Sequence, residues 1–137
     1  MLTGNARRFP DRIAWSFEGR AWSWGEANSR ANRAANGLRD LGLEHQDRVV
    51  ILANNSHRLA ELYFALAKAG LVAVAVNPRS VAREIGFIMK EVAARVLVAS
   101  AELAPRLAGL EPDIPRLAGV VGMGEDHGLP LDYEVLL

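Results

Sequence analysis

An α/β fold, with a mostly parallel sheet covered by helices on both faces and preceded by an N-terminal β-hairpin, is predicted by two features of this sequence. Short, nearly unbroken apolar runs rich in β-branched residues alternate with segments whose apolar residues recur every three or four positions. One hairpin pattern precedes this alternation. We therefore expect a single domain over residues 1–137, made of a hairpin (13–24), strand–helix repeats (25–121) and a loop tail (122–137).

The hairpin is predicted by alternation around a short turn. Ile13, Trp15 and Phe17 alternate with small residues, as in a half-buried strand. Glu18-Gly19 has the form of a two-residue turn in which glycine accepts a positive φ, and the next four residues run back antiparallel. All three tryptophans lie on or beside this hairpin. We expect their indoles to pack onto the domain rather than to stack on a ligand.

The helix after the hairpin is predicted by its start and by its apolar face. Ser23 and Glu26 have the spacing of a capping box, and Gly42 supplies the stop. The apolar face consists of Ala27, Ala31, Ala34, Ala35, Leu38 and Leu41.

The central stretch, residues 48–78, has the pattern of a strand–helix–strand unit. Residues 48–53 form an apolar run typical of a strand buried on both faces. Ser56 is placed to cap a helix, and Gly70 ends it in the position that favours a left-handed residue. Residues 71–76 are a second such run, which predicts two buried parallel strands joined by a right-handed crossover.

The same alternation continues towards the C-terminus. We expect Ser80 to cap a third helix, with Ile85, Ile88, Met89 and Val92 facing inward, and residues 95–99 to form a third buried strand. Ser100 should open a short helix that ends near Gly109, and residues 117–121 should form a fourth strand. From Gly122 onward we expect a loop, followed by a last helical turn in DYEVLL.

Composition excludes several classes of function. The formal net charge is zero, which removes the electrostatic argument for binding nucleic acid or an anionic membrane. There is no cysteine, so neither a disulfide framework nor a thiolate zinc site can form. No apolar run approaches the roughly 20 residues of a membrane span, and the first residues lack the apolar core of a signal peptide. We expect a soluble, cytoplasmic protein.

Most candidate catalytic groups have a structural explanation. The glycines at 119, 122 and 124 follow a predicted strand, but acidic residues and a proline follow them instead of a helix, so we reject a phosphate-binding loop. The three histidines lack partners at metal or triad spacing. Ser23, Ser56, Ser80 and Ser100 all occupy predicted N-cap positions.

Ligand binding is expected instead at the carboxyl ends of the parallel strands. In this sequence those ends are Asn54-Asn55, Asn77-Pro78-Arg79 and Ser100. Arg79 follows a strand and precedes a helix, where an anion could bind.

From Asn5 to about Ser100 the chain resembles the N-terminal part of the AMP-forming acyl-CoA synthetase and adenylation-domain superfamily. Four segments carry the resemblance in the family's order: NARRFPDRIAWSFEGRAWSWGEA, LGLEHQDRVVILANNS, FALAKAGLVAVAVNPR and REIGFIMKEVAARVLVAS. The chain departs from the family pattern at Trp22-Ser23-Trp24 in place of Leu-Thr-Tyr, Ala27 in place of Leu, Gln46 in place of Gly and Ala75 in place of Pro.

The resemblance implies an enzyme that uses ATP and Mg²⁺ to convert a carboxylic acid into an acyl-adenylate, releases pyrophosphate, and transfers the acyl group to a thiol, usually of coenzyme A. Asn77, Pro78 and Arg79 match a turn that lies near the approach of the thiol substrate in relatives. The family's phosphate loop, its adenylate and ribose motifs and its C-terminal lysine have no counterpart here, so the resemblance implies the opening subdomain of a larger ligase fold.

Three hypotheses follow. The first is an N-terminal fragment of an acyl-CoA ligase that is inactive alone, binds no cofactor alone, and self-associates through apolar surface along the tryptophan hairpin. The second is a stand-alone, non-catalytic module that binds a protein partner or a nucleotide. The third is convergence on a generic α/β binding domain. Fatty, aromatic and amino acids all remain open as substrates.

Overall fold

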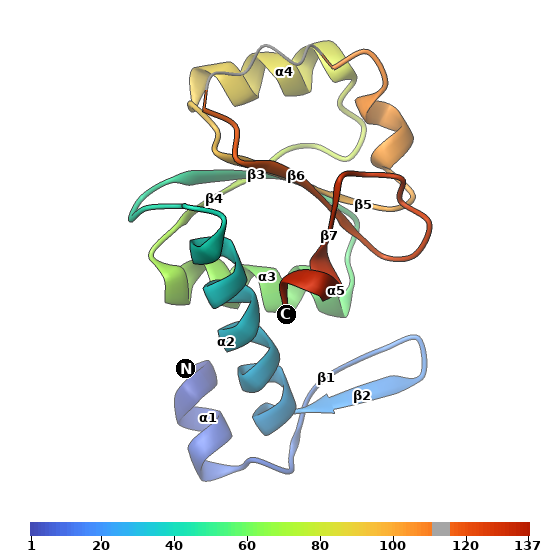
Figure 1. The fold of residues 1–137 in the computed structure, drawn as a ribbon. Helices are drawn as coiled ribbons and strands as arrows, with labels where there is room; N and C mark the ends of the chain where they lie inside the picture. The colour runs from blue at the N-terminus through green and yellow to red at the C-terminus, as the bar shows by residue number, and fades with distance from the viewer. Residues whose placement is uncertain (111–115) are drawn as a thin grey trace.

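A five-stranded parallel sheet forms the centre of the computed structural model, which describes residues 1–110 and 116–137 (Figure 1). The strand order is β4-β3-β5-β6-β7. These strands are Arg48–Leu52 (β3), Val72–Ala75 (β4), Val96–Ser100 (β5), Gly119–Met123 (β6) and Leu131–Asp132 (β7). All neighbours pair in parallel, as in Val50 opposite Leu97. The predicted parallel sheet is therefore confirmed.

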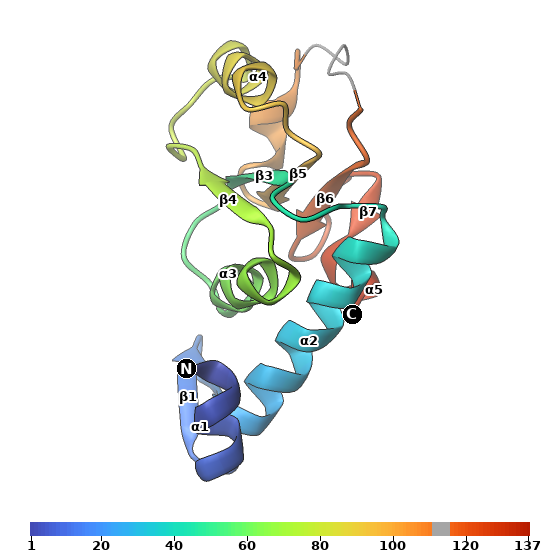
Figure 2. The same ribbon diagram turned by 90° about the vertical axis from the view of Figure 1, so that its left-hand side faces the viewer.

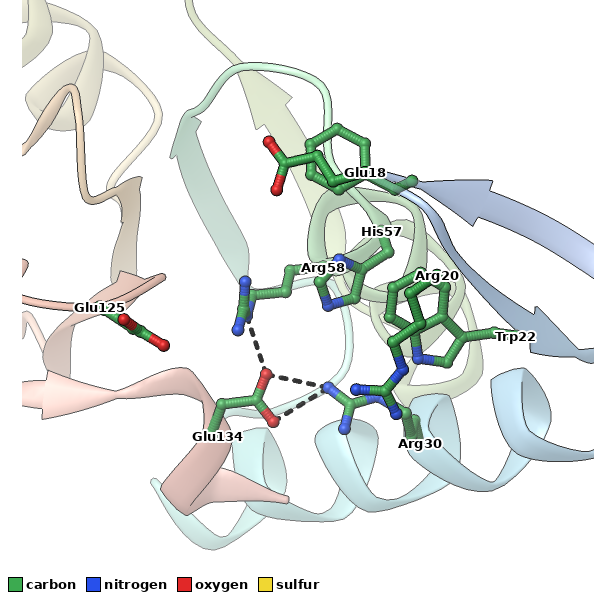
Figure 3. Close-up of a pocket in the computed structure, with 9 residues that line it drawn as sticks. Glu18, Arg20, Trp22, Arg30, His57, Arg58, Glu125 and Glu134 are labelled. Atoms are coloured by element: carbon green, nitrogen blue, oxygen red, sulfur yellow. Dashed lines mark hydrogen bonds and ion pairs between the residues drawn. The ribbon is translucent and has the colours of Figure 1, made fainter.

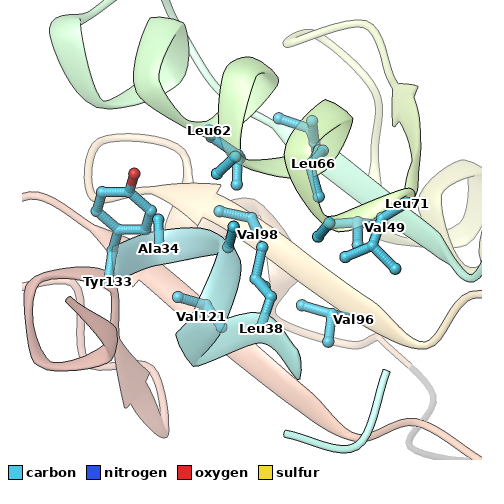
Figure 4. Packing of buried hydrophobic residues seen from close by; sticks show 14 of the residues in the cluster. Ala34, Leu38, Val49, Leu62, Leu66, Leu71, Val96, Val98, Val121 and Tyr133 are labelled. Atoms are coloured by element: carbon cyan, nitrogen blue, oxygen red, sulfur yellow. The ribbon is translucent and has the colours of Figure 1, made fainter. Parts of the chain in front are cut away.

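Helices cover both faces of this sheet, as predicted (Figure 1). One face carries Trp24–Asp40 (α2), His57–Ala69 (α3) and Tyr133–Leu136 (α5), and the other carries Ala82–Glu91 (α4) and the 3₁₀ turn Ala104–Leu107 (η1). Alternate strand residues supply the two cores. Val49 and Ile51 pack with α2, α3 and α5 (Figure 4), whereas Val50 and Leu52 pack with α4. Because both faces are buried, the apolar runs are unbroken.

The first segment of the chain lies beyond the sheet, against the first turns of α2 (Figure 2). Ile13–Phe17 (β1) and Arg20–Ser23 (β2) form a separate antiparallel hairpin, as predicted. Glu18 and Gly19 at its turn have φ values of 49° and 78°, as a type I′ turn requires. A helix over Leu2–Arg8 (α1) precedes the hairpin and was missed; its Leu2 packs on α2.

The tryptophans of the hairpin pack inward. Trp15 stacks on Phe64 with ring centroids 6.1 Å apart, and Trp22 stacks on His57 at 4.1 Å. Trp22 is only 3% exposed. The prediction that the indoles pack onto the domain is confirmed for these two tryptophans, which stack on side chains of α3. Self-association through apolar surface along the hairpin stays a prediction. Exposed apolar side chains include Ile13 in the hairpin and Phe87 in α4.

Local capping signals were correct where the chain enters α2 and α3. Ser23 Oγ accepts from the Glu26 N–H, and the Glu26 carboxylate accepts from the Ser23 N–H, which completes the capping box. Ser56 caps α3, and Gly70 ends it with φ 72°.

Two other predicted caps are wrong. The helix α4 begins after Val81, whose N–H donates to the Glu84 carboxylate, so Ser80 lies one residue outside the cap position. Ser100 is the last residue of β5 rather than a cap, and its Oγ accepts from the Asn54 N–H at 3.4 Å.

The edges of the sheet also differ from the prediction. The strand expected over residues 71–76 is not buried on both faces, because β4 pairs with β3 alone at the edge of the sheet. At the other edge, β6 continues to Met123, and β7 adds a short parallel strand inside the region expected to be a loop. The expected helical turn in DYEVLL is confirmed as α5.

Candidate functional site

The carboxyl edge of the sheet brings together part of the predicted site. Asn54 follows β3, and its side-chain amide donates to Glu102 at 3.0 Å while its N–H points at Ser100. Burial opposes the ionisation of Glu102, but hydrogen bonds from its own backbone, Ser100 and Asn54 outweigh it and lower the Glu102 pKa. These polar groups satisfy one another, which favours a structural role for them.

The predicted triplet Asn77-Pro78-Arg79 forms the turn between β4 and α4. Asn77 Oδ1 accepts from the Arg79 N–H at 2.9 Å, and the Asn77 carbonyl accepts from the Ser80 N–H. Arg106 donates to the Arg79 carbonyl at 3.3 Å. The Asn77 side chain is therefore committed to the turn, and only the Arg79 guanidinium of the triplet remains available to a ligand among the described residues. Its role near a thiol substrate stays a prediction.

A second site, which the sequence did not predict, is a pocket of about 370 Å³ at the same edge (Figure 3). Five separate segments form its wall: the hairpin, α2, the start of α3, the loop that follows β6, and α5. The lining residues are Phe17, Glu18, Arg20, Trp22, Arg30, His57, Arg58, Glu125 and Glu134.

Ion pairs occupy the floor of this pocket. Glu134 accepts from Arg30 at 3.0 Å and from Arg58 at 2.8 Å (Figure 3). Behind them, Arg30 Nε lies 2.6 Å from Glu61, whose side chain is fully buried, and the Tyr133 hydroxyl donates to Glu61 at 3.4 Å. This Arg30 network joins α2, α3 and α5.

Burial and charge act in opposite directions within the Arg30 network. Burial raises the pKa of Glu61, and the hydrogen bond and charge of Arg30 offset only part of that effect. Burial also opposes the ionisation of Glu134, but hydrogen bonds from Arg58 and Arg30 prevail and lower its pKa. Although burial opposes the charge of Arg30, the two carboxylates raise the Arg30 pKa, so it stays a cation. The network therefore joins α2, α3 and α5 through groups whose charges already have partners of opposite sign.

His57 is not poised for acid–base catalysis. Burial, followed by the nearby charges of Arg58 and Arg30, lowers its pKa to about 4, so the ring is neutral at pH 7. Its Nδ1 atom is buried without a hydrogen-bond partner. In the described ranges, no group of three or more His, Asp or Glu side chains is arranged to hold a metal ion, and no helix has the length and apolarity of a membrane span.

Comparison with known proteins gives consistent matches. The profile of a family described as AMP-binding enzyme matches residues 2–129. The chain is 34% identical to 3-methylmercaptopropionyl-CoA ligase of Ruegeria lacuscaerulensis over 102 residues. This aligned region covers 74% of this chain and 19% of that protein. It is 37% identical over 83 residues to the long-chain-fatty-acid–CoA ligase FadD13 of Mycobacterium tuberculosis, 61% of this chain and 16% of that protein. The chain thus spans less than a fifth of these relatives.

Solved structures match over nearly the whole chain. A protein of Rhodopseudomonas palustris described as a long-chain-fatty-acid CoA ligase superposes with a TM-score of 0.90 at 32% identity, over 98% of this chain and 34% of that one. A fatty acyl CoA synthetase of Mycobacterium tuberculosis superposes with a TM-score of 0.81 at 30% identity, over 88% and 25%. Sequence profile and structure agree that the chain belongs to the AMP-binding enzyme family.

Proposed function

We propose that this chain is the N-terminal part of an AMP-forming acid–thiol ligase, an acyl-CoA synthetase. Such an enzyme uses ATP and Mg²⁺ to activate a carboxylic acid and transfers the acyl group to coenzyme A. The observation that carries the proposal is the match to the Rhodopseudomonas protein, which covers 98% of this chain but only 34% of that one. We further propose that the enzyme acts in the cytoplasm.

The described residues do not themselves fit ATP or Mg²⁺. Mg²⁺ is held by several oxygen ligands at once, but in the described ranges no group of three or more His, Asp or Glu side chains could hold a metal ion, and Glu61 and Glu134 are paired with arginines. Beyond the carboxyl ends of β3 and β5, the polar groups bond one another. In the proposed enzyme this segment is a scaffold, and its Arg79 lies near the thiol substrate.

The acyl substrate is proposed only as a carboxylic acid. The relatives' names include long-chain-fatty-acid–CoA ligase, 3-methylmercaptopropionyl-CoA ligase and 4-hydroxybenzoate–CoA/benzoate–CoA ligase. No observation favours a stand-alone binding module over a segment of such a ligase.

A chimera tests the proposal. The aligned segment of the Mycobacterium fatty acyl CoA synthetase is replaced by the matching residues of this chain, and acyl-CoA formation and ATP–pyrophosphate exchange are measured with fatty acids. We expect a folded chimera to form acyl-CoA and the separate 137-residue chain to show no exchange. A folded chimera without activity, or robust exchange by the separate chain, would contradict the proposal.

A further inference from the structure

The helix α4 is the outermost layer on its face of the sheet (Figure 1). Ile85 and Met89 are fully buried and pack in the core beneath it. Phe87 lies midway between them in the sequence, and because a helix turns by roughly 100° per residue, its ring is on the opposite, outward side. Phe87 is 65% exposed. Single exposed apolar residues are common on protein surfaces. What distinguishes Phe87 is the arrangement of the charges around it.

Four exposed charged residues flank Phe87, and their signs are separated. Arg83 and Lys90 lie four positions before it and three positions after it, which places both cations roughly 40–60° to one side of the ring. Glu84 and Glu91 lie three positions before and four after, which places both carboxylates roughly 40–60° to the other side. None of the four lies three or four positions from another of opposite sign, so their spacing is not that of ion pairs along one helix. We call these five residues the α4 face.

The charges of the α4 face favour one kind of partner. Two cations and two carboxylates cancel, so an anionic membrane or a nucleic acid would meet the carboxylates together with the cations. A complementary surface needs an apolar centre with cations along one side and carboxylates along the other. A second copy of this chain offers that surface, and a two-fold interface brings identical patches together.

Only one orientation of two such helices joins opposite charges. When two α4 helices pack side by side and run in the same direction about a two-fold axis, the cationic side of each meets the acidic side of the other. Arg83 then faces Glu84 of the partner subunit, and Lys90 faces Glu91 of the partner subunit. In the antiparallel orientation, cations would face cations and carboxylates would face carboxylates.

The surface beside Phe87 has room for a second ring. A hollow of about 430 Å³, lined by α4 and Gly109, adjoins Phe87 on the side of the cations. Gly86 is part of its lining, and a Cβ added there would meet only Leu110 Cδ1, at 3.5 Å. The absence of a side chain at Gly86 therefore allows a partner to approach α4 closely.

We propose that the α4 face is a homodimer interface, in which two α4 helices pack in parallel around Phe87 and pair their cationic and acidic sides between copies. A helix face of this length buries less than the roughly 800 Å² per partner of a standard interface, so the dimer dissociates at micromolar or higher concentration. The contact uses only residues of α4 and does not depend on the proposed ligase activity.

Sedimentation equilibrium of the 137-residue chain over a range of micromolar concentrations tests the inference. Glu91→Lys places a cation opposite Lys90 of the partner subunit at two symmetry-related contacts, so the dissociation constant should rise about tenfold. The double variant Lys90→Glu with Glu91→Lys restores opposite pairs, so its dissociation constant should return to within about threefold of the parent value. In an antiparallel dimer, Glu91→Lys would instead relieve a repulsion with Glu84 and tighten association.

Controls separate the contact from folding and from net charge. Glu44→Lys makes the same change of net charge in the loop between α2 and β3, and should leave the dissociation constant unchanged. Circular dichroism establishes that each variant is folded. Arg83→Glu, which opposes Glu84 of the partner subunit, is a second charge reversal that should weaken the dimer if Glu91→Lys does not fold. A monomeric parent chain, a dissociation constant that Glu91→Lys leaves unchanged or lowers, or dimers that Ile13→Ser in the hairpin abolishes would overturn the inference.

Discussion

Replacing Arg30 by methionine should lower the free energy of unfolding by about 3–5 kcal/mol, because it strands a buried charge. Arg30 lies 2.6 Å from Glu61, which is fully buried. Methionine retains an apolar stem of similar length, so the change removes the charge more than the packing. Without Arg30, the Tyr133 hydroxyl at 3.4 Å is the remaining hydrogen-bond partner of Glu61 among the described residues.

Two matched variants separate burial from charge. Arg58→Met breaks a pair with Glu134, but these side chains are 26% and 39% exposed, so the expected loss is below about 1 kcal/mol. The double variant Arg30→Met with Glu61→Leu removes both members of the buried pair. The double variant should recover much of the stability that Arg30→Met loses, because it no longer buries a carboxylate that must be desolvated.

The pH dependence provides a further check. Burial raises the Glu61 pKa of the folded chain above the ordinary value of 4.5. At pH values between the ordinary pKa and the raised one, the folded chain binds more protons than the unfolded chain, so the free energy of unfolding decreases as pH rises. Loss of Arg30 should raise this pKa further. In urea titrations the deficit of Arg30→Met relative to the parent should therefore be larger at pH 7 than near pH 4.5. A deficit at pH 7 no larger than that of Arg58→Met, or one that grows towards acid, would refute the reasoning.

Three further predictions concern other residues. The pKa of His57 is lowered from 6.5 to about 4, so between these pH values the unfolded chain binds a proton that the folded chain does not. The free energy of unfolding should therefore decrease as pH falls from 6.5 to about 4. In His57→Phe the urea midpoint should decrease less over the same range. Gly37→Ala should lower the melting temperature, because the added Cβ would meet the Leu136 backbone carbonyl. Gly86→Ala should instead stabilise α4 by about 0.5–1 kcal/mol, because its Cβ would meet only one flexible side-chain atom, at 3.5 Å. Equal shifts of the melting temperature in the two variants would contradict this. We expect self-association at micromolar concentration, and Phe87→Ser, at a residue 65% exposed, should reduce it in light scattering; an unchanged mass would exclude α4 as the contact.

The sequence predicted those elements whose signals are local. Ser23 with Glu26 and Ser56 are true caps because an apolar helical face begins immediately after each of them. Ser80 and Ser100 have the same residue type, but the first lies one residue before the cap and the second belongs to β5. The exposure of β4 depends on strand order, which the apolar run does not encode.

The pocket could not be predicted in the same way. Arg30 and Glu134 are 104 positions apart, and each resembles an ordinary surface charge in its own helix. Glu61 carried one usable signal. Apolar residues surround it on most sides of α3, so the helix leaves that carboxylate no exposed face and requires a cationic partner. The identity of the partner required the tertiary structure.

The positions of the charged groups indicate how substitutions here should affect a ligase. The Arg30 network fastens α5 to α2 and α3, and its carboxylates and guanidinium groups are already paired with one another. Groups that perform chemistry must instead be free to exchange protons or to bind substrate. Substitutions in the network should therefore reduce the amount of folded enzyme, with little change in kcat for the molecules that do fold. Arg79 differs, because its guanidinium is unpaired among the described residues. In the proposed ligase we expect a change there to alter the KM for the thiol without loss of stability.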